Sequence, residues 1–353
     1  HTLGNFTSEH RPKRIRERTG ASIMEEQDRA MYDVVVVGGG AAGLSGALML
    51  GRSRRSVLVI DADEPRNAPA AAVHGFMSRD GISPAELLET GREEVRSYGV
   101  QMLDGRVVSA ESVDGGFTVD LEEGSRIGAR RLLVTTGLVD ELPDVPGVRQ
   151  LWGRDVLHCP YCHGWEVRDQ QIGILGTGPM AAHQAQLFRQ LSADVVLFRH
   201  TSPTLSEEQA EQLNARGITV VDGEVSALEV HDDRLAGVRL SSGEFVPRQA
   251  VVVAPRFVAR AEVLSALGLE TTDREISGHV LGSYVPADAT GTTIVPGVWV
   301  AGNVADPFGQ VAAAANAGAQ AGAHINADLI AEDTRNAVAA HRDHMSSSTV
   351  GRL

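Results

Sequence analysis

Cysteine is scarce in this chain, which has only two among its 353 residues. Two cysteines cannot form the disulfide framework that stabilises small secreted proteins, so we expect a reducing, cytoplasmic compartment and one reactive pair. Aromatic residues are also few, at 4%, while apolar residues reach 42% and glycines number 38. This length and composition are typical of an α/β protein with two domains and sizeable cores.

An excess of positive charge is absent as well, since the formal net charge is -14. This charge argues against an extended nucleic-acid surface. The uncharged stretch 34–51 contains six glycines and divides into a strand, a turn and a helix, so we expect no membrane span. Residues 1–30 have no apolar period and mix basic with acidic side chains, which predicts a solvated tail rather than a signal peptide.

Both cysteines lie in one short motif, Cys159-Pro160-Tyr161-Cys162-His163. Two thiols separated by two residues can close a small disulfide. Such a pair is redox-active when a nearby positive charge or a helix N-terminus lowers the pKa of one thiol and makes it the attacking thiolate. The motif therefore predicts a dithiol switch.

Other interpretations of this motif are weaker. His158 and His163 could complete a zinc site, but four ligands within six residues cannot easily surround a tetrahedral ion, so we expect no metal. Cys159, Cys162 and His163 also match the c-type haem attachment spacing, which would require export. The pair resembles a glutaredoxin motif too, although there it follows the first strand of a small domain. Two inert buried thiols would have no reason to bracket Pro-Tyr beside two histidines.

A first glycine-rich loop follows the β-branched run at residues 34–37, which is typical of a strand buried on both faces. Its three glycines are Gly38, Gly40 and Gly43. The first permits a tight turn, the second lets the backbone approach a pyrophosphate, and the third lets a helix at 41–50 pack closely. A second strand at 57–60 ends at Asp61, whose carboxylate can accept from a ribose hydroxyl. This order predicts a dinucleotide site.

A second, degraded loop comes after the cysteines, with Gly176, Gly178 and Pro179 following a strand at 172–175. Proline lacks a phosphate-facing N–H, which costs little only at the first position of a helix. The next strand, at 194–198, is followed by Arg199 instead of an acid. A cation there could meet a ribose 2′-phosphate, which favours NADPH over NADH.

This order of motifs resembles the low-molecular-weight thioredoxin reductase family, the class II FAD-dependent pyridine nucleotide-disulfide oxidoreductases, over residues 31–330. The resemblance implies two Rossmann-like, three-layer ββα domains of α/β class, the second inserted into the first. The FAD-binding domain would comprise residues 31–141 and 255–330, and the inserted NAD(P)-binding-like domain residues 142–254, with a C-terminal tail at 331–353. Hinges are expected at 140–147 and 253–260, which contain Pro143, Pro146 and Pro255.

The resemblance also implies the site residues. Cys162 would lie beside the flavin and Cys159 nearer solvent. Further cofactor contacts are expected from Ala41, Ala42, Asn67, His74, Thr136, Gly137, Gly302, Asn303, Gly309, Gln310 and Val311.

The chain departs from the family pattern at three places. His163 replaces the usual general-acid aspartate; it can transfer the same proton, and as an imidazolium it would stabilise a Cys162 thiolate. Asn303 replaces a FAD-binding aspartate and keeps an acceptor for a ribityl hydroxyl. The arginines that usually bind the NADP phosphate are reduced to Arg199, which puts NADPH in doubt.

The implied activity is electron transfer from NADPH through FAD and the cysteines to an external disulfide, in a homodimer. The disulfide would belong to a thioredoxin-like protein or a small molecule. An alternative, found in a branch of the family, is an O2-dependent oxidase that closes a disulfide in a sulfur-rich natural product without NADPH. A non-catalytic flavin- or nucleotide-binding sensor is a second alternative, against which the intact cysteine pair argues.

Overall fold

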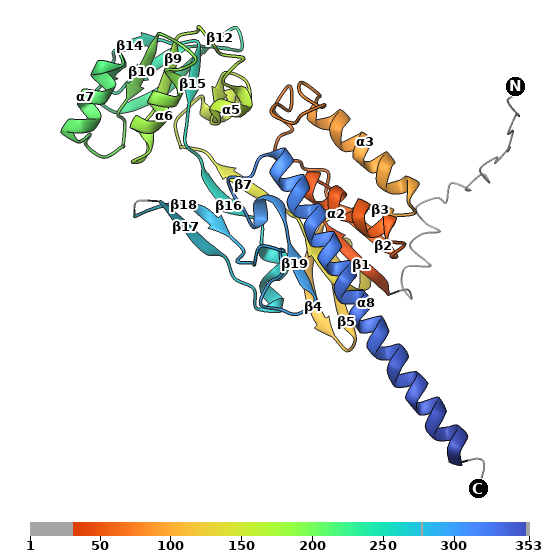
Figure 1. The fold of residues 1–353 in the computed structure, drawn as a ribbon. Coiled ribbons are helices and arrows are strands. Elements are labelled where there is room, and N and C mark those ends of the chain that lie inside the picture. Colours follow the sequence, from red (N-terminus) through yellow and green to blue (C-terminus); the bar gives the residue numbers. More distant parts are fainter. Residues whose placement is uncertain (1–30, 277, 351–353) are drawn as a thin grey trace, which may run out of the picture.

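The chain forms two α/β bodies joined by a pair of short strands, as shown by a computed structural model that describes residues 31–276 and 278–350 (Figure 1). Within this part, side chains are described as far as residue 345. The N-terminal tail expected at 1–30 lies outside the described residues.

The first body is built on a seven-stranded sheet. Its parallel strands are β3 (Gln101–Asp104), β2 (Val57–Asp61), β1 (Tyr32–Val37), β6 (Arg126–Val134) and β19 (Val298–Val300), and its antiparallel strands are β5 (Gly116–Leu121) and β4 (Val107–Val113). Alternate residues of β1 enter different cores: Val34 and Val36 pack with helices α2 (Ala41–Arg52), α3 (Pro84–Ser97) and α8 (Val311–Val350), and Val35 and Val37 pack with β5 and β6. The β-branched run is therefore buried on both faces, as predicted.

The second body has its own five-stranded parallel sheet, in the order β11-β10-β9-β15-β8. These strands are β8 (Val156–Leu157), β9 (Ile172–Leu175), β10 (Val195–Phe198), β11 (Thr219–Val221) and β15 (Ala250–Val252). A three-stranded antiparallel sheet lies beside it, made of β12 (Val225–His231), β13 (Arg234–Leu240) and β14 (Phe245–Pro247). The helices are α4 (Val148–Leu151), α5 (Pro160–His163), α6 (Ala181–Phe188) and α7 (Glu207–Ala215).

The chain enters the second body through β7 (Leu138–Glu141) and leaves it through β16 (Arg256–Ala259). These strands pair antiparallel and continue into a hairpin of β17 (Thr272–Ile276) and β18 (His279–Tyr284) (Figure 1). Two 3-10 helices, η1 (Glu262–Leu267) and η2 (Gly302–Val304), follow in the first body. The predicted fold class, with one Rossmann-like unit inserted into another, is confirmed.

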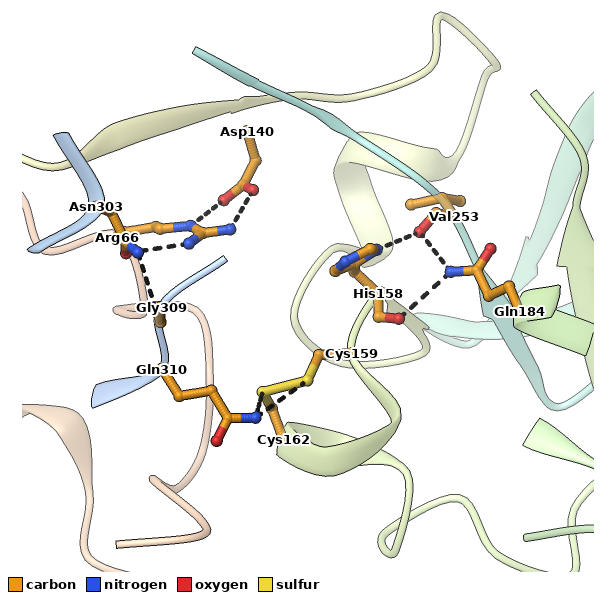
Figure 2. Close-up of a disulfide and its surroundings, with 10 residues drawn as sticks. All are labelled: Arg66, Asp140, His158, Cys159, Cys162, Gln184, Val253, Asn303, Gly309 and Gln310. Carbon is orange, nitrogen blue, oxygen red and sulfur yellow. Dashed lines mark hydrogen bonds and ion pairs between the residues drawn. A yellow bond between two sulfur atoms is a disulfide. The ribbon is translucent and has the colours of Figure 1, made fainter. Parts of the chain in front are cut away.

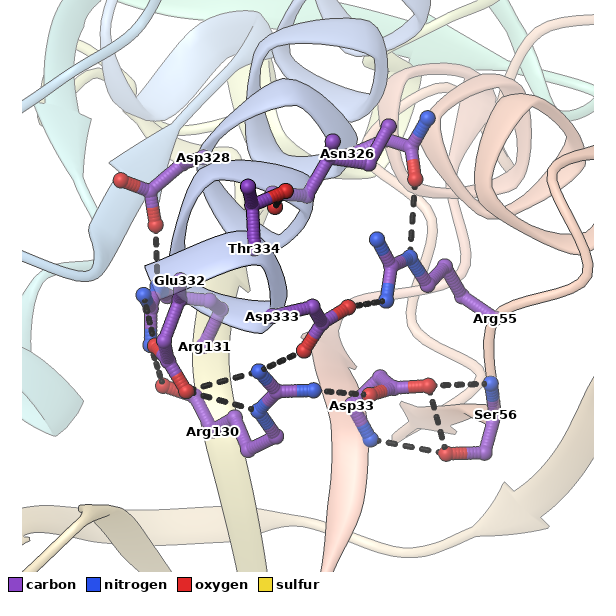
Figure 3. Close-up of polar contacts among 11 residues, drawn as sticks. Asp33, Arg55, Ser56, Arg130, Arg131, Asn326, Asp328, Glu332, Asp333 and Thr334 are labelled. Carbon is purple, nitrogen blue, oxygen red and sulfur yellow. Dashed lines mark hydrogen bonds and ion pairs between the residues drawn. The ribbon is translucent and has the colours of Figure 1, made fainter. Parts of the chain in front are cut away.

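Helix α8 is longer than the sequence analysis predicts, because it continues through the expected C-terminal tail to Val350. Figure 3 shows how it is held: Arg130 and Arg131 in the middle of β6 bind Glu332, and Arg130 also binds Asp333. Arg55 binds Asp333 as well. These ion pairs hold the first turn of the segment expected as a tail against the sheet. None of the described helices, α8 included, has the length and apolarity needed to cross a bilayer.

Candidate redox site

A cavity of about 890 Å³ lies between the two bodies and brings most of the expected site residues together. It is lined by the first glycine-rich loop, the cysteine motif and the turn before α8. Of the expected residues, the lining includes Gly38, Gly40, Ala41, Ala42, Asp61, Asn67, His74, Thr136, Gly137, Cys159, Cys162, His163, Gly302, Asn303, Gly309, Gln310 and Val311. Residues far apart in the chain therefore converge on one site.

The glycines of the first loop have the geometry that a bound pyrophosphate requires. Gly38 has a φ of 102°, and a Cβ atom there would lie 2.6 Å from the Thr135 carbonyl oxygen. At Gly40 a Cβ would meet nothing within 4 Å, so the backbone faces open space in the cavity. At Gly43 a Cβ would lie 1.9 Å from the Gly38 oxygen, so only glycine fits at this third position beneath the loop. The loop fits FAD.

Asp61 ends β2 at the cavity, where a ribose-binding carboxylate is expected. Its Oδ2 is 3.3 Å from the Arg92 guanidinium. At the end of β6, Thr135 Oγ1 donates to the carbonyls of Val37 and Gly38, and Thr136 Oγ1 donates to the Arg260 carbonyl at 2.5 Å. The two threonines thus connect β6 to the glycine-rich loop and to the segment after β16.

Cys159 and Cys162 form a disulfide, with their Cα atoms 5.3 Å apart. Cys159 is the N-cap residue of the short helix α5, and Pro160 occupies its first turn, where a missing N–H costs little. Gln310 Nε2 lies 3.9 Å from both sulfur atoms, from the turn that opens α8 (Figure 2). The disulfide therefore faces the segment that is expected to contact the flavin.

His163 directly follows Cys162 and lines the same cavity. Its Nε2 is buried and has no hydrogen-bond partner among the residues that the structure describes. Burial lowers the pKa of His163, an effect that the nearby Glu166 only partly opposes. With the disulfide closed, the imidazole is neutral at pH 7, so the structure favours a proton acceptor over the imidazolium that the sequence analysis considered.

His74 connects the two bodies. Its Nδ1 lies 3.4 Å from Asp80 in the same loop, and its Nε2 lies 3.4 Å from Glu166, three residues beyond His163. The Asp80 carboxylate also accepts from the Gly75 N–H at 2.9 Å. His74 therefore lies between a carboxylate of the first body and a carboxylate of the second, and it lines the cavity.

The second loop lies outside this cavity. Gly176, Gly178, Pro179 and Arg199 are not among its lining residues. Helix α6 begins only at Ala181, so Pro179 does not occupy its first position as the sequence analysis considered. Arg199 forms an ion pair with Asp222 at 3.0 Å, so its charge is already partly neutralised.

Helix α6, which follows the second loop, lines the cavity with one of its faces. The lining residues are spaced three and four apart in the sequence, as expected for one face of a helix. This face comprises Met180, His183, Gln184 and Leu187.

Asn303 has hydrogen-bond partners within the protein on both its side-chain oxygen and its nitrogen. Its Oδ1 accepts a hydrogen bond from Arg66 at 3.1 Å, and its Nδ2 donates to the Gly309 carbonyl (Figure 2). The same Nδ2 also donates to the Asp306 carbonyl. The side chain thus organises its own turn, where the sequence analysis expected an acceptor for a ribityl hydroxyl. Arg66, which sequence reasoning missed, carries no motif of its own; only its position before Asn67 in the cavity loop could have pointed to it.

Comparisons with known proteins agree with this arrangement. The profile of the pyridine nucleotide-disulphide oxidoreductase family matches residues 32–321. Thioredoxin reductase tcpT from Claviceps purpurea is 30% identical, covering 86% of this chain and 95% of that protein. Thioredoxin reductase sirT from Leptosphaeria maculans is also 30% identical, covering 86% and 96%. The crystal structure of HlmI is 47% identical with a TM-score of 0.82, covering 90% and 98%. An oxidoreductase from Agrobacterium tumefaciens is 33% identical with a TM-score of 0.80, covering 85% and 99%.

Proposed function

Since the chain belongs to the pyridine nucleotide-disulphide oxidoreductase family, we propose that its Cys159–Cys162 pair passes electrons between FAD and an external disulfide or dithiol. The enzyme is an FAD-dependent disulfide oxidoreductase of the thioredoxin reductase type. The observation that carries the proposal is that the disulfide and the dinucleotide loop line the same cavity. Inert structural cysteines would have no need of that position.

We assign a separate role to the FAD-binding loop, to each cysteine and to His163. FAD, when bound by the Gly40 loop and Asp61, supplies a two-electron donor or acceptor next to the disulfide. Opening the Cys159–Cys162 bond consumes two electrons and two protons, and closing it releases them. We assign Cys159 to exchange with the external sulfur and Cys162 to the inner position. His163 holds the proton that leaves or joins a cysteine sulfur.

The exposed aromatic side chains of the motif and of the residues after it suit an external substrate. Tyr161 is 71% exposed and Trp165 is 65% exposed, and the Arg168 guanidinium stacks 4.3 Å from the Trp165 ring. Exposed aromatic rings beside a reactive pair offer area for a protein or a small molecule that carries the exchanging sulfurs. We propose a thioredoxin-like protein or a small dithiol as partner, and a cytoplasmic homodimer as the working form.

In the reductase direction, NADPH delivers a hydride and the external disulfide leaves as two thiols. Two relatives named thioredoxin reductase, each matching more than nine-tenths of its length, support this direction. Here the second glycine-rich loop would hold the nicotinamide nucleotide. Arg199 is its candidate phosphate contact.

A second candidate is a dithiol oxidase, in which a substrate dithiol gives two electrons and two protons and O2 leaves as hydrogen peroxide. The ion pair between Arg199 and Asp222 favours this candidate, because a guanidinium held by a carboxylate is less available to a 2′-phosphate. The Arg199 Nε is also buried without a partner among the described residues. In this direction the second loop has no nucleotide to bind.

Anaerobic titration of the yellow protein separates the two candidates. In the reductase direction, NADPH bleaches the flavin, and Asp222→Asn raises kcat/KM for NADPH by about threefold because it frees Arg199 from an exposed ion pair worth about 0.6 kcal/mol. Glu229→Gln, which frees Arg239 on another sheet, is the matched control and should change nothing. If neither nucleotide bleaches the flavin, but a dithiol does and air restores the colour, the oxidase is the correct direction.

The proton role of His163 predicts a specific pH profile. His163→Ala is expected to slow thiol exchange by about a hundredfold. In the unmodified enzyme the rate should fall as pH drops through the lowered His163 pKa, below about 6.5, because the protonated ring cannot accept a proton. This acid limb should disappear in His163→Ala, and His163→Asp should restore most of the rate. An unchanged acid limb in His163→Ala would assign the proton transfer to another group.

A further inference from the structure

Arg66 has no part in the proposed function, yet it makes several contacts at the junction of the two bodies. Its Nε and Nη2 donate to the two oxygens of Asp140 at 2.8 and 2.7 Å, and its Nη1 donates to Asn303 (Figure 2). Its guanidinium also lies 5.1 Å from the centre of the Phe257 ring. The Asp140 side chain is only 9% exposed and that of Arg66 30%. Such a paired, stacked arginine holds one geometry strongly.

Two of these partners lie on the strands that join the bodies. Asp140 belongs to β7 and Phe257 to β16, and they are directly opposite each other in the antiparallel pair. Opposite residues in a strand pair project on the same face. Arg66 comes from the loop after β2 in the cofactor domain. It therefore contacts both connecting strands at the same position along the strand pair.

The third partner leads to the disulfide. Asn303 holds the carbonyl of Gly309, and the next residue, Gln310, contacts both sulfur atoms. On the other side, the Phe257 ring meets His158, the residue before Cys159, edge-on at 5.2 Å. A continuous set of contacts thus runs from Arg66 to both sides of the cysteine pair.

We propose that Arg66 is a positioning residue, which locks the Asp140–Phe257 strand pair to the Asn303–Gly309 turn and so holds the disulfide towards the cofactor cavity. This inference rests on the proposed function, because it concerns how the inserted body presents its cysteines. Loss of Arg66 leaves a nearly buried Asp140 carboxylate unpaired, which pushes the strand pair away from this position. The cysteines then spend more time turned to solvent.

The test uses the full chain and measures alkylation of the reduced cysteines by iodoacetamide, with and without FAD. Arg66→Met and Asp140→Asn are each expected to react about tenfold faster, the effect of losing about 1.4 kcal/mol of constraint. Measurement at several pH values separates exposure from a change in thiol pKa. Arg256→Met is the matched control: it removes an exposed ion pair with Glu141 on the same two strands, and its alkylation rate should not change.

A second readout follows electrons within one turnover. Stopped-flow reduction by an excess of a small dithiol, which gives its two electrons first to the disulfide, should show flavin bleaching slowed about tenfold in Arg66→Met, while the disulfide opens at the normal rate. Unchanged alkylation and bleaching in both variants would overturn the inference. If Arg66→Met fails to fold, Asp140→Asn decides alone. Failure of the unmodified enzyme to pass electrons between thiols and flavin would instead refute the proposed function.

Discussion

Cys162→Ser is expected to lower kcat with any disulfide or dithiol substrate by roughly a thousandfold or more, because a serine hydroxyl can neither form nor break the Cys159–Cys162 bond. The structure joins these two sulfurs as a disulfide that lines the cofactor cavity. The chain has no third cysteine that could substitute. Steady-state rates with a thioredoxin-like protein and with small dithiols measure the loss.

The same variant should keep its flavin and its unfolding temperature, since the cysteines are not expected to hold the cofactor. Cys159→Ser should be equally slow in turnover but should retain the inner sulfur. Turnover that survives Cys162→Ser would show that electrons reach the substrate directly, without the pair. The disulfide would then be a structural feature of the inserted body.

Gly40→Val is expected to weaken FAD binding by roughly a hundredfold or more, about 2.7 kcal/mol. A Cβ at this position meets no protein atom within 4 Å, so the chain can accept the valine. The added side chain would occupy the space where a pyrophosphate approaches the backbone. Flavin absorbance per protein after purification, and titration of the flavin-free protein with FAD, measure the effect.

Gly178→Val provides a matched control in the second loop. A Cβ there also meets nothing within 4 Å, but the residue does not line the cavity. This variant should keep a full flavin content and, in the reductase direction, raise KM for NADPH by about tenfold. Equal flavin loss in both variants would mean that the effect of Gly40→Val is one of stability rather than of cofactor binding.

The sequence was most informative where one local rule fixes one geometry. The β-branched run at 34–37 could only be a strand buried on both faces, and the glycines after it require the turn that the structure has at Gly38. Likewise, the spacing of Cys159 and Cys162 requires that the thiols be close. These features depend on neighbours in the chain and were predicted correctly.

The missing parts depend on contacts between distant segments. Arg66 meets Asp140 and Asn303 only because two loops and a strand converge, which no periodicity reveals. Likewise, Glu332 of α8 binds Arg130 and Arg131, which lie some 200 residues away in the chain. For the same reason the sequence does not reveal that Arg199, the expected phosphate contact, pairs with Asp222, which follows the neighbouring strand β11.

Counting the electrons that the protein accepts tests the central claim most directly. Anaerobic titration of the FAD-loaded chain with dithionite, which reduces the flavin directly, should consume about four electrons per subunit, two for the disulfide and two for the flavin, and Cys162→Ser should consume about two. Free thiols, counted at each point, should appear together with flavin bleaching in the unmodified chain. A chain that bleaches after about two electrons while Cys159–Cys162 stays closed would contradict the account, because the flavin and the disulfide would then not exchange electrons.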